Sequence, residues 1–303
     1  MNTCTPLYFL SGPTASGKTA AAHLLAEKMN LRLLSVDSMM VYRGMNIGTA
    51  KPTPGEISRY SYAGLDLVEA GSRFSTGSWL HRVSAQLDER PTLAVGGTGL
   101  YFRGLIDGLS PELPATDAPP SALPVTELQR RIASLNPDAL QKIADPGNPR
   151  RLERALQWLE AGNPLPDQWD EKAGFPLPVL RLEVEELNRR IYQRAKMMLE
   201  QGLLEETRQL SEQGLLTGTA AQAIGYGEAL KVLQGEWSPE QALEQIATRT
   251  RRYAKRQRTW FRNQMDARWI DIGPGENPEF IADKIARVWQ ETGPFLFDRS
   301  AYV

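Results

Sequence analysis

The chain has 303 residues, of which 41% are hydrophobic and 23% are charged. This composition is typical of a folded globular protein, and the length suits a core domain with a smaller appendage. The 35 Lys and Arg residues nearly balance 36 Asp and Glu residues, which excludes a uniformly basic surface but not a local basic face. A single cysteine, Cys4, excludes a disulfide framework and a cysteine-based zinc site, and the two histidines exclude a histidine-rich metal site.

Short apolar runs alternate with a helical pattern in the first third of the chain. Leu7–Leu10, Leu31–Val36 and Thr92–Val95 are predicted strands, and the alanine-rich segment Lys18–Met29 is a predicted helix. Strands that alternate with helices favour a parallel α/β sheet. No basic leader with a cleavage site precedes the first strand, and no stretch approaches the roughly 20 apolar residues of a membrane helix. We therefore expect a cytoplasmic protein without membrane contact.

A proline-rich stretch, Leu109–Pro124, interrupts this pattern and cannot form a regular element. One helix is expected after it, near Thr126–Leu135. We place an α/β core at residues 1–110, a short inserted segment at 111–149, and the rest of the core with a helical region at 150–303.

The remainder of the chain is predicted to be mostly helical. A helix is expected over Arg150–Ala161, and Val179–Val184 is typical of a strand that returns to the core. Helices are expected over most of 185–265. An edge strand at Arg268–Ile272 and a final helix near Glu279–Glu291 complete the predicted elements.

The strongest motif matches G-x-x-x-x-G-K-[ST] and lies between a predicted strand and a predicted helix, where a phosphate-binding loop (P-loop) belongs. Its glycines allow backbone N–H groups to turn inward around a diphosphate, and the helix N-terminus adds positive potential. Lys18 supplies a full charge, and the Thr19 hydroxyl can hold Mg²⁺. The motif leaves open which compound carries the phosphates. The predicted diphosphate-binding residues are Gly12, Pro13, Thr14, Ala15, Ser16, Gly17, Lys18 and Thr19.

Two further features follow predicted strands. Asp37 lies at the carboxyl end of a strand, an edge that borders the ligand crevice in parallel sheets. Its carboxylate suits a metal ligand, a general base or a ribose ligand, and a turn or helix N-cap is an equally good interpretation. The glycines of Gly96–Gly99 have two interpretations that the sequence supports equally. Either the backbone approaches a ligand closely here, or the segment forms a tight turn.

Arginines mark two other candidate sites. Arg190 and Arg194 share one helix face and could clamp a pyrophosphate. Alternatively, they are solvated or pair with Glu185 and Glu186. The segment Arg249–Arg262 (RTRRYAKRQRTWFR) holds seven basic residues and no acidic one. Such a concentration favours contact with a nucleic-acid backbone. Its aromatic residues either stack on bases or bury the inner face of the helix.

Together these motifs resemble the tRNA dimethylallyltransferases, also called tRNA isopentenyltransferases. The most specific match is Asp37–Pro52 (DSMMVYRGMNIGTAKP), which is similar to the family's D-S-x-x-x-Y-x-G-M-x-I-G-T-A-K-P. The other matches occur in family order over about residues 7–272. They are Gly12–Thr19, Gly96–Phe102 (GGTGLYF), Arg151–Leu156 (RLERAL), Arg190-Ile191 with Arg194, Ala223–Tyr226 (AIGY), Ala254–Gln257 (AKRQ) and Thr259-Trp260.

The resemblance implies transfer of a dimethylallyl group from dimethylallyl diphosphate to N6 of adenine 37, beside the anticodon of tRNA, with Mg²⁺ as cofactor. It implies a P-loop kinase-like core with flanking helices, an inserted helical domain and a helical C-terminal part. Asp37 takes the role of general base, with Lys18 and Thr19 as the other catalytic residues. Thr19 would meet Mg²⁺ and Arg194 the diphosphate. The expected partners are the tRNA anticodon stem-loop and dimethylallyl diphosphate, and we expect a monomer.

The same resemblance implies contacts to tRNA, and two departures from the family bear on them. The segment between Leu109 and Arg150 is shorter than is usual in the family, so the inserted domain is expected to be reduced. Gly227-Glu228 stands where the family often has Arg-Gln or Lys-Glu, so a basic contact is missing there. The implied tRNA-contacting residues are Asp37, Ser38, Met39, Met40, Thr98, Arg150, Arg151, Leu152, Glu153, Arg154, Gln222, Ala223, Ile224, Gly225, Tyr226 and Gly227.

Three alternative functions fit parts of the sequence. A small-metabolite P-loop kinase explains the P-loop and Asp37 but not the Asp37–Pro52 run. An adenine-nucleotide prenyltransferase shares the core but has no need of the basic segment. A non-enzymatic RNA-binding module does not explain the presence of the P-loop.

Overall fold

The computed structural model describes residues 3–109, 123–165, 171–273 and 275–302. The chain forms two compact units, one made of Met1–Gly108 with Ala173–Val303 and the other of Leu109–Lys172. The insertion therefore extends to residue 172, and the predicted boundary between 149 and 150 is wrong. Most of the proline-rich stretch, residues 110–122, lies outside the described residues.

The reason for the longer insertion is a small hydrophobic core within the second unit. Helix α5 (Val125–Leu135) packs against α6 (Pro149–Glu160), and a short 3-10 helix, η1 (Ala139–Lys142), lies between them in the chain. The apolar face of α6 is thus buried against α5. The buried residues of this core are Leu128, Ile132, Ala139, Leu152, Ala155 and Leu156.

The first unit is built on a parallel sheet with the strand order β2-β5-β1-β6-β7, so the α/β prediction is confirmed. The predicted edge strand is β7, which begins three residues earlier than expected. A further strand, β8 (Phe295–Asp298), pairs antiparallel with the first half of β1. The parallel strands are β1 (Cys4–Ser11), β2 (Arg32–Val36), β5 (Thr92–Gly96), β6 (Ala173–Leu182) and β7 (Met265–Ile272).

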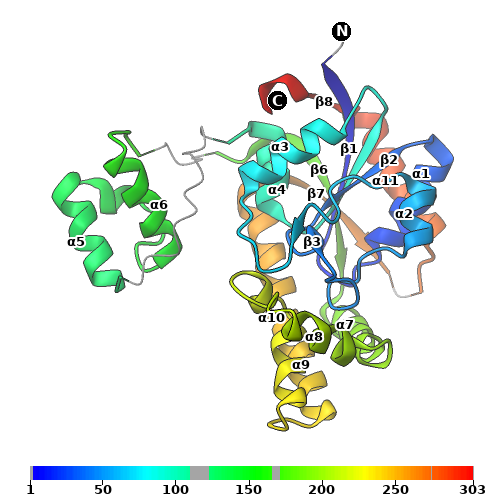
Figure 1. Cartoon of the computed structure of the whole chain (residues 1–303). Coiled ribbons are helices and arrows are strands. Elements are labelled where there is room, and N and C mark those ends of the chain that lie inside the picture. The colour runs from blue at the N-terminus through cyan, green and yellow to red at the C-terminus, as the bar shows by residue number, and fades with distance from the viewer. Residues whose placement is uncertain (1–2, 110–122, 166–170, 274, 303) are drawn as a thin grey trace. The chain divides into compact units, whose positions relative to one another are not determined.

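Helices cover both faces of this sheet (Figure 1). On one face, α1 (Lys18–Met29) packs with α11 (Pro278–Thr292), and Leu10 points into their common core. On the other face, α3 (Thr76–Gln86) packs with α4 (Gly99–Asp107), and Phe9 meets Phe102 edge-to-face. Neighbouring residues of β1 thus serve opposite layers, as the alternation of a strand requires.

Between β2 and α3 the chain forms a short helix and a two-stranded parallel sheet that the sequence analysis did not predict. They are α2 (Pro54–Tyr60), β3 (Tyr42–Arg43) and β4 (Val68–Glu69). After β6 the chain is mostly helical, as predicted, and a last 3-10 turn, η3 (Arg299–Tyr302), follows β8. The helices after β6 are α7 (Val184–Glu200), α8 (Leu203–Glu212), η2 (Ala220–Gln222), α9 (Tyr226–Leu233) and α10 (Pro239–Gln264).

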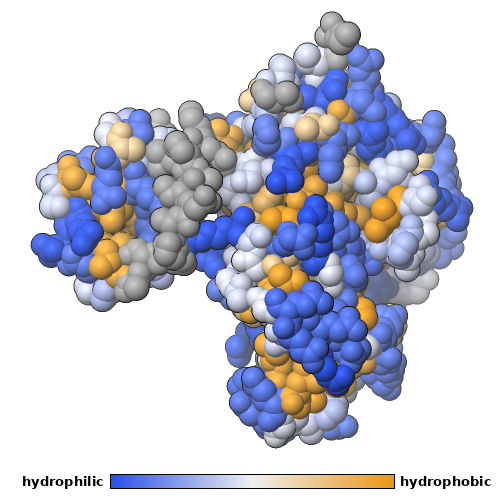
Figure 2. Space-filling model, viewed as in Figure 1, coloured by the Kyte–Doolittle hydropathy of each residue, from blue (hydrophilic) through white to orange (hydrophobic). Residues whose placement is uncertain are grey.

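Among the described residues, no helix is both long and apolar enough to cross a membrane. Figure 2 shows hydrophilic residues over most of the viewed face, with hydrophobic residues in separate smaller areas.

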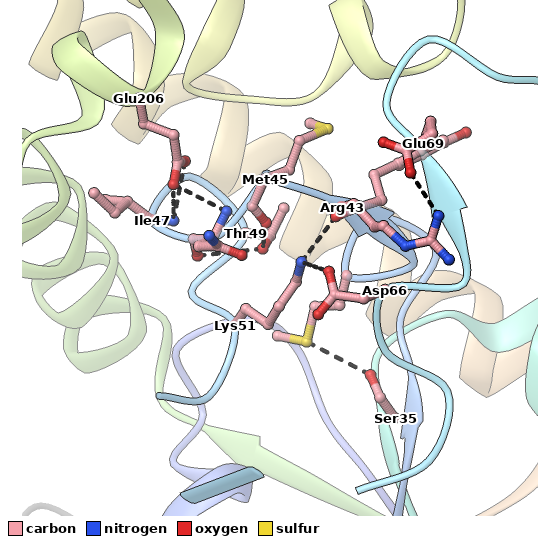
Figure 3. A network of polar contacts seen from close by, with 12 residues as sticks. Ser35, Arg43, Met45, Ile47, Thr49, Lys51, Asp66, Glu69 and Glu206 are labelled. Atoms are coloured by element: carbon pink, nitrogen blue, oxygen red, sulfur yellow. Dashed lines mark hydrogen bonds and ion pairs between the residues drawn. The ribbon is translucent and has the colours of Figure 1, made fainter. Parts of the chain in front are cut away.

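A carboxylate from α8 holds the loop that contains the most specific motif of the sequence (Figure 3). Glu206 accepts hydrogen bonds from the backbone N–H groups of Asn46, Ile47 and Gly48, at 2.9–3.2 Å, and from the hydroxyl of Tyr226 at 2.7 Å. On the other side of the loop, the buried ammonium of Lys51 donates to the carbonyl of Tyr42 and pairs with Asp66. The loop is therefore anchored from two sides by charged groups.

Gly48 is required for this anchoring. A Cβ at this position would lie 2.4 Å from the ring of Tyr226, a distance that real Cβ atoms do not adopt. The close approach of the loop to Tyr226 thus explains one glycine of the motif.

We predict that Glu206→Gln lowers the free energy of unfolding by about 1–3 kcal/mol, because an amide turns a donor toward backbone N–H groups that need an acceptor. The neighbouring Glu205 is exposed, and its partners among the described residues are Arg208 and Gln209 of its own helix. Glu205→Gln is therefore a matched control, with an expected change within about 0.5 kcal/mol. Urea unfolding followed by circular dichroism measures both. Equal effects of the two substitutions would contradict an anchoring role for Glu206.

Candidate active site

The P-loop runs from the end of β1 into α1, as predicted. Ala15 and Gly17 adopt left-handed φ values of 64° and 89°, and the Ser16 N–H donates to the carbonyl of Pro13 at 3.2 Å. The ammonium of Lys18 folds back over the loop and donates to the same carbonyl at 3.3 Å. The hydroxyl of Ser16 is buried and has no hydrogen-bond partner among the described residues. The loop therefore has the shape of a phosphate-binding loop, and its Ser16 hydroxyl is free to bond to a ligand.

Two cations close to this loop have no carboxylate partner within ion-pair distance in the described part of the chain. They are Lys18 and Arg194 of α7, whose guanidinium donates only to the carbonyl of Thr49 at 3.4 Å. The pKa of Lys18 is lowered to about 8: burial is the main cause, the charge of Arg194 acts in the same direction, and the charge of Asp37 opposes both. Burial also lowers the pKa of Arg194. Cations that are desolvated but left unpaired favour an anionic ligand.

Arg190 differs from Arg194, although they share a helix face. Its Nε donates to Glu186 at 2.6 Å, which is the pairing that the sequence analysis left open. Its guanidinium nevertheless lies near the P-loop, 3.6 Å from where a Cβ of Gly17 would be.

Asp37 follows β2 and lies at the carboxyl edge of the sheet. Its Oδ1 accepts a hydrogen bond from the Met39 N–H at 2.8 Å, so the turn interpretation is correct for that oxygen. The N–H of Ser38, the residue between them, donates to the Thr98 hydroxyl at 3.0 Å. The charge of Asp37 also acts on Lys18 and Arg194. Asp37 thus shares one polar site with both unpaired cations.

Two phenols border the same carboxylate. Burial is the main cause that raises the pKa of Tyr101 and of Tyr253, and the negative charge of Asp37 is the second. Both phenols therefore stay neutral near pH 7 and keep a proton to donate.

The inner face of α10 packs on the glycine turn after β5. A Cβ on Gly97 would lie 2.2 Å from Nε2 of Gln257, and one on Gly99 would lie 2.1 Å from the ring of Trp260. Gly96 is equally restricted, because a Cβ would meet the backbone of β2 at 2.0 Å. Close packing against protein, rather than against a ligand, thus explains these three glycines.

The outer face of α10 carries a basic stripe, which we define as Arg252, Lys255, Arg256 and Arg262, all exposed. Arg249, by contrast, pairs with the buried Glu228 and donates to the carbonyl of Gln222. About half of the predicted basic segment is therefore available to a partner in solution.

The sequence-predicted tRNA contacts fall into three groups. Ser38, Met39, Met40 and Thr98 lie beside Asp37 and are partly exposed. Of the second group, Gln222–Gly227, the residues Ala223, Gly225 and Tyr226 are buried, and Tyr226 bonds to Glu206. The side chains of Ala223 and Tyr226 therefore face the protein interior, and the contact of this segment with tRNA stays a prediction.

The third group, Arg150–Arg154, lies on α6 in the second unit. Arg150, Arg151 and Arg154 are exposed, whereas Leu152 is fully buried in that unit's core. Leu152 is therefore a packing residue and does not offer its side chain to a partner.

The described residues contain no cluster of three or more His, Cys, Asp or Glu side chains that could hold a metal ion. Thr19 lies in the first turn of α1 with an exposed side chain. Mg²⁺ is commonly held by one or two protein oxygens together with phosphate oxygens of a substrate. The Thr19 hydroxyl beside a phosphate cradle fits that arrangement, in which the ligand itself supplies further oxygens.

Comparisons with known proteins identify the family of the chain. The family model "IPP transferase" matches residues 40–264, and the model "Isopentenyl transferase" matches residues 5–65. A tRNA dimethylallyltransferase of Synechococcus sp. (strain CC9311) is 41% identical over 281 residues, which cover 86% of this chain and 87% of the relative. A tRNA dimethylallyltransferase of Bacillus pumilus (strain SAFR-032) is 35% identical and covers 92% of both chains.

A solved structure shares the fold. The tRNA isopentenylpyrophosphate transferase of Bacillus halodurans is 31% identical, with a TM-score of 0.65, over 95% of this chain and 97% of that one. Because a family model matches well over half of the chain and relatives above 30% identity span nearly all of it, the chain belongs to the tRNA dimethylallyltransferase family.

Proposed function

We propose that this protein transfers the dimethylallyl group of dimethylallyl diphosphate to N6 of adenine 37 in the anticodon stem-loop of tRNA, giving N6-dimethylallyladenosine. The observation that carries the proposal is the pair of unpaired cations, Lys18 and Arg194, beside the P-loop and Asp37. Such a site suits a reaction that releases diphosphate next to a carboxylate. Membership in a family whose named members are tRNA dimethylallyltransferases supports the same reaction.

In the proposed reaction, the bond between C1 of the dimethylallyl group and the diphosphate oxygen breaks as N6 of adenine forms a bond to C1. The N6 amino group is a weak nucleophile, because its lone pair is delocalised into the ring. Asp37 aligns this group and accepts its proton. The P-loop amides, Lys18 and Arg194 receive the negative charge that develops on the departing diphosphate. When bound at Thr19, Mg²⁺ neutralises further charge on the phosphates.

The exposed basic stripe of α10 favours a polynucleotide over a free nucleotide as acceptor, because phosphate contacts dominate nucleic-acid affinity. It therefore argues against an adenine-nucleotide prenyltransferase. A metabolite kinase is disfavoured because the two family models together cover the Asp37–Pro52 run and α10. A cytoplasmic location and a monomeric state remain part of the proposal.

The role of Asp37 is tested by Asp37→Asn. The amide oxygen can still accept the Met39 N–H, so the turn is preserved while the negative charge is lost. We expect turnover to fall by roughly a hundred- to ten-thousandfold, the usual range for a positioned base. The dissociation constant for tRNA should stay within a few-fold. Restoration of activity by raised Mg²⁺ would identify a metal ligand instead, and loss of tRNA binding would identify a recognition residue.

The pKa of Lys18, about 8, predicts a pH dependence of diphosphate binding. Below this pH the lysine is charged before the anion arrives, whereas above it a proton must be taken up, so affinity falls as the pH rises through 8. Isothermal titration with inorganic pyrophosphate between pH 6.5 and 9.5 measures the effect. Lys18→Arg stays charged throughout and should flatten the dependence, while the ionisation of pyrophosphate itself is common to both proteins. Identical pH profiles would contradict this assignment.

The basic stripe predicts a steep salt dependence of tRNA binding. Replacing Arg252 and Arg256 together by Gln should reduce the slope of log K against log salt by about 1.5–2, which corresponds to two phosphate contacts. Lys28→Gln, at the far end of α1 and paired with Asp283, is the control that should leave the slope unchanged. Filter binding at several salt concentrations measures both. A slope unaffected by the double substitution would remove the stripe from the interface.

A further inference from the structure

We propose that Gln257 is a positioning residue that holds the P-loop at a fixed distance from the glycine turn after β5, and so sets the affinity of the site for diphosphate. The proposal rests on the proposed function, because it concerns the same diphosphate site.

The side chain of Gln257 bridges two loops. Its Oε1 accepts a hydrogen bond from the Thr14 N–H at 3.1 Å, and its Nε2 donates to the carbonyl of Gly97 at 2.9 Å. The two loops follow β1 and β5, which are adjacent parallel strands, so both open onto the ligand edge of the sheet. Gln257 itself is only 6% exposed. The bridge is thus a buried link between the two sides of the candidate site.

The chemistry of the link requires an amide. One end must accept from a backbone N–H and the other must donate to a backbone C=O, and the side chain of Gln does both while remaining neutral. A carboxylate at this position would satisfy Thr14 but not Gly97, and would add negative charge near the bound diphosphate. An apolar side chain would leave both buried backbone groups without their partner.

The bridge also determines which backbone donors of the P-loop face a ligand. The Thr14 N–H is engaged by Gln257 and the Ser16 N–H by Pro13. With these two held inside the protein, the loop keeps one conformation before the anion arrives. A binding loop that is already ordered loses less conformational entropy on binding, and so binds more tightly. Gln257 therefore raises affinity without touching the diphosphate.

The structure offers a second way to break the same link. A Cβ on Gly97 would lie 2.2 Å from Nε2 of Gln257, and the next nearest atoms are Cδ of Gln257 at 3.4 Å and the Gly12 carbonyl oxygen at 3.5 Å. Gly97→Ala therefore collides with the bridge and with nothing else at short distance. The two sites can be combined in a double-mutant cycle.

The first experiment compares Gln257→Met with Gln245→Met, an exposed glutamine on the same helix. Titration with inorganic pyrophosphate and Mg²⁺, without tRNA, reports on the loop alone. We expect Gln257→Met to weaken pyrophosphate binding by about tenfold, and Gln245→Met to change it less than twofold. The dissociation constant for an anticodon stem-loop should stay within about twofold in both. Unchanged pyrophosphate affinity in a folded Gln257→Met protein, as judged by circular dichroism at the titration temperature, overturns the proposal.

The second experiment adds Gly97→Ala and the Gln257→Ala single and double variants. If the bridge is the target, Gly97→Ala weakens pyrophosphate binding in the wild-type background but adds almost nothing to Gln257→Ala. Additive losses would mean that the two residues act independently, which also overturns the proposal. This pair keeps the test decisive if Gln257→Met does not fold. Failure of the proposed function would appear differently, as a wild-type protein that neither binds pyrophosphate nor prenylates tRNA.

Discussion

The site depends on leaving two partly buried cations, Lys18 and Arg194, without a carboxylate partner. Desolvation of Lys18 and Arg194 is unfavourable, and a nearby acid would relieve it, as Glu186 does for Arg190 one turn earlier on α7. Asp37 lies close enough to moderate both charges, but it forms no ion pair with either. An anionic ligand would then neutralise the positive charges of Lys18 and Arg194. In the proposed function, the free energy lost by leaving these cations unpaired is recovered when the diphosphate binds.

That arrangement survives only if the surrounding loops are held by other interactions. The loop at Asn46–Gly48 bonds to a carboxylate of α8, and the P-loop bonds to an amide of α10. Neither anchor contributes charge inside the cradle: Glu206 is satisfied by four donors, and Gln257 is neutral. The helices after β6 therefore fix the geometry of the site while leaving its positive potential intact.

The sequence predicts the local features of this site and misses the long-range ones. The P-loop was recognisable because its function needs a fixed pattern within eight residues, and Asp37 because it follows an apolar run. Glu206 and Gln257 bond to their loops across 158 or more positions in the chain, so nothing near them in the sequence indicates these loops as partners. The inserted unit was cut short for a similar reason. The amphipathic face of α6 was visible, but its packing partner on α5 was not.

The helix α10 combines two tasks because its faces differ. Tyr253, Gln257 and Trp260 recur at intervals of four and three residues, so they lie on one face, and each meets a residue of the glycine turn. The basic stripe occupies the face turned to solvent. The interleaved aromatic residues, which the sequence alone left between base stacking and burial, therefore belong largely to the inner face, as the fully buried Phe261 also indicates. A helix is stiff over a few turns. The position of the basic stripe on the outer face of α10 is therefore fixed relative to the P-loop, which the inner face contacts. A displacement of α10 large enough to release the polynucleotide would also move Gln257. The same helix thus fixes the positions of the two substrates of the proposed reaction relative to each other.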